Sequence, residues 1–136
     1  MRLRVICPFK NGSVWQEIFS TEVIQRLKNG LEMKFVLLII SNQDVSSEAT
    51  LLLVLGDLDN SHYSILDGSI SKLLEENDGI ALANFQSRGG GYIRIIDDCI
   101  IFYGHSEGCG NYDRELLSIV DDSCFLEYFQ VGGINK

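Results

Sequence analysis

Residues 33–56 read MKFVLLIISNQDVSSEATLLLVLG, and this stretch decides the fold because it holds two runs of aliphatic and β-branched side chains. Such runs are typical of buried β-strands, and both are far too short to cross a bilayer. We therefore predict a central strand over residues 34–40 and a second buried strand over residues 50–55. The polar residues 41–47 between them are expected to form a loop.

The sequence that follows these strands predicts a helix over about residues 62–77. Asn60 and Ser61 carry side chains that cap helix starts well, and Asp78-Gly79 is typical of a helix end. The apolar residues of this segment share one helical face; they are Leu66, Ile70, Leu73 and Leu74. His62 is thus expected at the N-terminus of a helix.

Short apolar runs separated by turn signals continue to the end of the chain. They predict strands over residues 80–85, 92–96, 99–103 and 125–131, and a helix over residues 112–120 with Asn111 as its N-cap. Gly89-Gly90-Gly91 is expected to interrupt the strands, and Asp97-Asp98 to form the turn of a hairpin. Residues 132–136 are expected to be a loose tail.

The N-terminal part predicts one more strand and one more helix. Residues 3–7 alternate like a short strand, and Ser13 offers an N-cap to a helix that ends at Asn29-Gly30. No repeat, low-complexity run or linker divides the chain. We therefore predict a single domain over residues 1–136 of class α+β (α/β), with a mixed β-sheet of about six strands and helices packed on it.

Charge and hydropathy exclude several classes of partner. The formal net charge of −8 would repel a polyanion, so we expect no nucleic-acid binding, and any site for an anion must be local. The basic N-terminus is followed by Pro8 and Lys10 before any long apolar stretch, which is unlike a signal peptide. We expect a cytoplasmic protein that does not associate with membranes; its oligomeric state stays open.

The four cysteines are scattered, and none forms a C-x-x-C pair. Zinc sites show close pairs, so we expect reduced thiols and no metal. A metalloenzyme built on His62, His105 and Cys109 is the least favoured alternative, because their spacing matches no ligand pattern.

Two loops can carry anion chemistry, since each is expected to meet a helix start with unpaired backbone N–H groups. The first holds His62. The second, residues 103–110, reads YGHSEGCG, in which three glycines allow backbone amides to face a ligand and Ser106 adds a hydroxyl. The two histidines of the chain, His62 and His105, both fall in these loops.

Several of these residues resemble the protein histidine phosphatases, the Janus/ocnus family. Residues 33–38 are similar to the family's first strand with its lysine, and residues 62–67 to its H-x-x-I-x-D segment. The most specific part is Gly89-Gly90-Gly91, followed by a hairpin and then Y-G-x-S, with a glycine four residues after Ser106. The resemblance covers about residues 33–131, and residues 1–32 are a strand–helix extension without a counterpart.

The resemblance implies a metal-independent phosphohydrolase without cofactors, which removes phosphate from phosphohistidine or a related phosphoramidate. Its substrate would be a phosphorylated protein or a small phosphoramidate. His62 would be the catalytic residue, acting as a base or as a nucleophile. The residues implied to bind substrate are Lys34, Tyr63, Arg88, His105, Ser106, Glu107 and Gly108, with the phosphate held by the amides of residues 105–108 and the Ser106 hydroxyl.

Two alternatives from other classes remain. One is a catalytically inactive module of the same fold that binds phosphoproteins; Leu55 and Tyr92 stand where the family carries arginines, and Glu107 adds a negative charge to the loop. The other is a protein in which residues 1–31 act, their helix covering a sheet edge or forming a dimer contact. Covering the edge is the preferred form of this alternative.

Overall fold

The aliphatic run of residues 33–40 forms the strand β3 (Met33–Ile40), whose neighbours are the strands β4 (Thr50–Gly56) and β5 (Phe85–Ile96). The computed structural model describes residues 1–8, 15–16, 21–41, 49–76, 78–121, 123 and 125–135. Its other strands are β1 (Arg2–Pro8), β2 (Trp15–Gln16), β6 (Cys99–Tyr103) and β7 (Gly133–Asn135). The helices are α1 (Thr21–Lys28), α2 (His62–Glu76), α3 (Leu117–Asp121) and α4 (Phe125–Phe129), and two 3-10 turns are η1 (Leu82–Asn84) and η2 (Arg114–Leu116).

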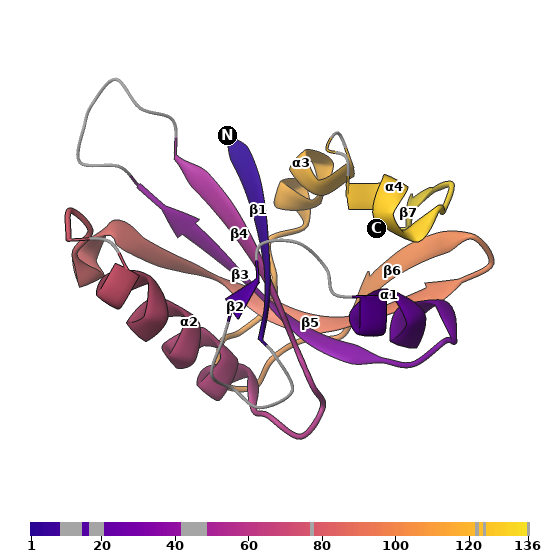
Figure 1. The fold of residues 1–136 in the computed structure, drawn as a ribbon, viewed down its shortest axis with the longest axis horizontal. Helices are drawn as coiled ribbons and strands as arrows, with labels where there is room; N and C mark the ends of the chain where they lie inside the picture. The colour runs from indigo at the N-terminus through magenta and orange to yellow at the C-terminus, as the bar shows by residue number, and fades with distance from the viewer. Residues whose placement is uncertain are drawn as a thin grey trace.

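The seven strands form one curled sheet in the order β2-β1-β4-β3-β5-β6-β7 (Figure 1). β3 pairs antiparallel with β4 and β5, whereas β1 pairs parallel with β4 and β7 pairs parallel with β6. The prediction of an α+β fold with a mixed sheet is confirmed.

β3 is apolar along almost its whole length because helices cover both faces of the sheet. Side chains alternate between the faces, so Phe35 and Leu37 join one apolar cluster and Val36 and Leu38 join the other. The first cluster includes residues of α1, α3 and α4, and the second includes Ile65 and Leu73 of α2. Figure 1 shows α2 alone on its side of the sheet. Lys34 falls on the α2 face, at the start of β3.

The prediction that the triple glycine interrupts the strands is wrong, because all three glycines lie within the continuous strand β5. The strand predicted over residues 80–85 is instead mostly the 3-10 turn η1, with β5 beginning at Phe85. The register between β3 and β5 shifts at the glycines, because Leu37 of β3 lies opposite two residues of β5, Arg88 and Gly89, which form a bulge. The predicted hairpin turn is confirmed, since Asp97 and Asp98 both have positive φ and join β5 to β6.

The C-terminal predictions were wrong in part. Residues 125–129 form α4 rather than a strand, because Phe125 and Phe129 are four residues apart and both pack into the core. The expected loose tail contains β7, which pairs with β6. The helix predicted over residues 112–120 begins later, with η2 and then α3, and its cap is Asp113, whose side chain accepts from the amide of Glu115.

The N-terminal strand is confirmed as β1, but the helix after it is shorter than predicted. Trp15 and Gln16 form β2, and among the described residues the helix begins at Thr21; the predicted cap Ser13 lies outside the described residues. β1 lengthens the sheet beyond β4, while α1 packs Val23 and Leu27 against the sheet face rather than covering an edge. None of the helices in the described part of the chain is long and apolar enough to cross a membrane.

Candidate active site

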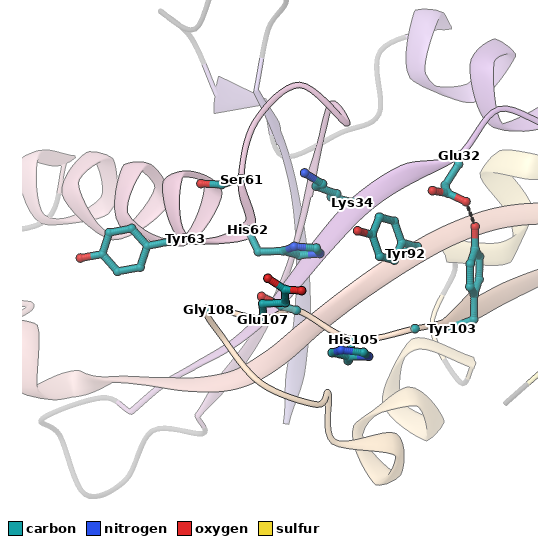
Figure 2. A pocket seen from close by; sticks show the side chains of 12 residues that line it. Glu32, Lys34, Ser61, His62, Tyr63, Tyr92, Tyr103, His105, Glu107 and Gly108 are labelled. Atoms are coloured by element: carbon teal, nitrogen blue, oxygen red, sulfur yellow. Dashed lines mark hydrogen bonds between the residues drawn. The ribbon is translucent and has the colours of Figure 1, made fainter.

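One row of paired residues forms the floor of a cavity on the α2 face of the sheet. Lys34 of β3 pairs with Tyr92 of β5, and Tyr92 pairs with Tyr103 of β6. The N-terminus of α2 closes one side of an open cavity of about 610 Å³ above this row, and the loop after β6 closes another (Figure 2). Its lining residues are Glu32, Lys34, Ser61, His62, Tyr63, Tyr92, Tyr103, Gly104, His105, Ser106, Glu107 and Gly108.

His62 is fixed in place by the start of α2. Ser61 caps the helix, because its Oγ accepts from the Ser64 amide at 3.1 Å, as the sequence predicted. His62 is therefore the first helical residue, and it falls on the same buried face as Ile65 and Leu73. Its side chain is only 7% exposed, yet it lines the cavity. The N–H groups of His62 and Tyr63 have no partner among the described residues, as is usual in a first turn.

The orientation of the His62 ring follows from its contacts with β5. Nε2 lies 2.7 Å from the carbonyl oxygen of Gly91, and because a carbonyl can only accept, Nε2 carries the proton and donates. A Cβ on Gly90 would lie 3.1 Å from Cδ2 of the ring, so this edge is packed against the strand. The Tyr92 ring packs edge to face against the His62 ring, with 5.3 Å between the two ring centroids. In the neutral ring, Nδ1 is then the nitrogen that carries the lone pair, and it lies across the ring from the Cδ2 edge that faces β5.

The loop after β6 is a tight turn held by Ser106 and Gly110. The amide of Gly110 donates to the Ser106 carbonyl at 2.8 Å, and the Ser106 Oγ accepts from the Cys109 amide at 2.9 Å. Ser106 is 1% exposed, so its hydroxyl shapes the turn from inside. The amides of Glu107 and Gly108 have no hydrogen-bond partner within the described part of the chain, and both residues line the cavity.

Few positive charges face this cavity. Lys34 is the one lysine or arginine among the described lining residues, and its Nζ donates to the Asn60 carbonyl at 2.8 Å, next to the start of α2. Two carboxylates line the cavity as well. Glu32 accepts the Tyr103 hydroxyl, whereas Glu107 forms no hydrogen bond or ion pair with a described residue.

The structure brings together seven of the eight residues that the sequence singled out: Lys34, His62, Tyr63, His105, Ser106, Glu107 and Gly108. Arg88 does not line the cavity, and its guanidinium donates to Gln86 at 3.1 Å. Arg94 lies on the same face of β5 as Tyr92, but it does not line the cavity either, and its guanidinium donates to the carbonyl of Gly30 at 3.3 Å. Of the two histidines, His62 adjoins a helix start, whereas His105 does not, because the helical turn after it begins at Arg114.

Five lining residues were not predicted as site residues: Glu32, Ser61, Tyr92, Tyr103 and Gly104. Tyr92 and Tyr103 lie on the same face of the sheet as Lys34. Strand alternation identifies this shared face only when the pairing of β3, β5 and β6 is known. Glu32 precedes β3, and nothing in its local sequence points to a cavity.

A neutral imidazole can accept a proton or act as a nucleophile, and backbone amides without a partner among the described residues can donate to a group on which negative charge develops. Among the described residues, no group of three or more His, Cys, Asp or Glu side chains is placed to hold a metal ion. No protein-family model and no curated protein matches this sequence.

Proposed function

We propose that this chain is a metal-independent phosphohydrolase that removes phosphate from phosphohistidine or a related phosphoramidate, in the manner of the histidine phosphatases it resembles. The observation that supports the proposal best is the contact between His62 and Gly91. In the neutral ring this contact leaves the lone pair on Nδ1, in a cavity whose backbone amides at Glu107 and Gly108 have no partner among the described residues. The substrate is a phosphorylated protein or a small phosphoramidate.

The phosphoryl group would sit between the two sets of amides. Those of Glu107 and Gly108 and those of the first turn of α2 would donate to its oxygens, where charge builds during transfer. Lys34, whose Nζ donates to the Asn60 carbonyl, would add a positive charge at the helix start. His62 Nδ1 would then take a proton from an attacking water, or bond to phosphorus itself and be freed by water in a second step.

A phosphoramidate suits this cavity because its leaving nitrogen can be protonated, so the reaction needs less electrophilic assistance than hydrolysis of a phosphate ester. The phosphoprotein-binding module remains the second candidate. Lys34 is the one lysine or arginine among the lining residues that the structure describes, and Tyr92 stands where the family carries arginine; both features favour binding without turnover.

The experiment that separates the two incubates the protein with a peptide chemically phosphorylated on histidine, in the presence of EDTA. We expect release of inorganic phosphate that saturates with peptide and is lost with the His62→Gln substitution. Saturable binding without release, measured on the same peptide by calorimetry, would assign the binding module instead. Neither release nor binding would contradict both.

A further inference from the structure

The cavity holds a charged group that the proposed hydrolysis has not used. Glu107 lies in the turn between Ser106 and Gly110, and its side chain is exposed and lines the cavity. Figure 2 shows its carboxylate directed toward the His62 ring. The Glu32 carboxylate is occupied by Tyr103, but that of Glu107 is paired with no described residue.

This carboxylate is unfavourable for an ordinary phosphate ligand. Among the described lining residues, an ester dianion would meet two carboxylates and one ammonium group, and like charges at short distances repel. The repulsion changes sign for a substrate that carries a positive charge beside its phosphoryl group. A protonated phosphoramidate is such a substrate, since its N–H is a charged donor that a carboxylate accepts from strongly.

We propose that Glu107 binds the protonated leaving nitrogen and selects N-phosphoryl over O-phosphoryl substrates. The proposal rests on the proposed function, and it deepens that function by naming the residue that sets the substrate class. Glu107 accepts a hydrogen bond from the N–H⁺ of the leaving group, while the amides of its own turn and of α2 hold the phosphoryl oxygens.

The chemistry balances without proton transfer to Glu107. Water bonds to phosphorus as His62 Nδ1 takes one of its protons, the P–N bond breaks, and its electron pair returns to the leaving nitrogen. The leaving group already bears the proton, on the phosphorylated nitrogen or on the second nitrogen of an imidazole ring, and so departs as a neutral amine or imidazole. The other products are hydrogen phosphate and the His62 imidazolium, which returns its proton to solvent.

The test measures kcat/KM of the wild-type chain and of Glu107→Gln on two substrates, a phosphohistidine peptide and 4-nitrophenyl phosphate. We expect a loss of about 10- to 100-fold on the phosphoramidate, which is the worth of one hydrogen bond to a charged group. In Glu107→Gln, the turnover of 4-nitrophenyl phosphate should be unchanged or faster, because a repulsive charge is gone. If the ester acts only as a competitive inhibitor, it should bind equally well or more tightly. Glu107→Asp should recover part of the selectivity.

The matched control is Glu127→Gln, the same change at an exposed position of α4 away from the cavity. It should leave both substrates unaffected. If Glu107→Gln leaves the phosphoramidate reaction unchanged, or slows both substrates equally, the proposal fails while His62-dependent hydrolysis stands. If the wild-type chain turns over neither substrate, the proposed function fails, and the role of Glu107 with it.

Discussion

Replacing His62 by glutamine should abolish phosphoramidate hydrolysis while leaving the fold near its native stability. The glutamine side-chain amide can donate to the Gly91 carbonyl in place of Nε2, but it offers no lone pair in the place of Nδ1. We expect kcat to fall by at least ~10³-fold, within the range for removing an acid–base or nucleophilic group. Phosphate release from a phosphohistidine peptide measures the rate, and thermal unfolding checks the fold.

Two further variants define the cause of the loss. His62→Ala should be equally inactive but less stable by roughly 1–3 kcal/mol, because the buried Gly91 carbonyl loses its donor. His105→Gln alters the second histidine of the cavity, which is exposed, and should keep activity within a few-fold. Near-native turnover by His62→Gln would remove this histidine from the mechanism.

Replacing Gly89 by alanine should cause the largest loss of stability of any single methyl addition to β5. The residue has φ +83°, and an added Cβ would collide with the backbone of Asn111 and Tyr112, which neither a rotamer change nor a flexible side chain can relieve. We expect a loss of at least roughly 3 kcal/mol, or a fall in Tm of about 10 °C or more. Thermal unfolding followed by circular dichroism measures it.

Gly30→Ala provides the matched control, because Gly30 has nearly the same φ of +81° but an added Cβ would meet nothing within 4 Å. It should cost only the left-handed strain, about 1 kcal/mol. Equal losses at the two positions would show that the close approach of β5 to residues 111–112 is not what requires glycine at position 89.

The central strands and α2 could be predicted from the sequence because their signals are local. The apolar run of β3 is long enough to identify a strand buried on both faces, and Ser61 caps α2 within its own turn. His62 was placed at a helix start for that reason, and the structure puts it at the cavity.

Other elements could not be predicted because long-range contacts decide them. Gly89 and Gly90 read locally as an interruption, yet they are strand residues that let residue 111 and the His62 ring approach the backbone. The segment with Phe125 and Phe129 fits either a short strand or a helix, and burial of both rings on one face selects the helix.

The candidate site shows the same division. Residues that belong to short motifs, such as Ser106 and Gly108, were identified from the sequence. Tyr92 and Tyr103 reach the cavity through the registers of three strands, whereas Arg88 lies beside the register shift in the β3–β5 pairing and does not line the cavity.

A long-range ¹H–¹⁵N spectrum of the two imidazoles, recorded with and without inorganic phosphate, tests the account most directly. It should show that Nε2 of His62 carries the proton and that Nδ1 is unprotonated. Phosphate should shift that nitrogen and the amides of Glu107 and Gly108 together, along one saturation curve. A proton on Nδ1, or phosphate that leaves these three signals unmoved, would contradict the site described here.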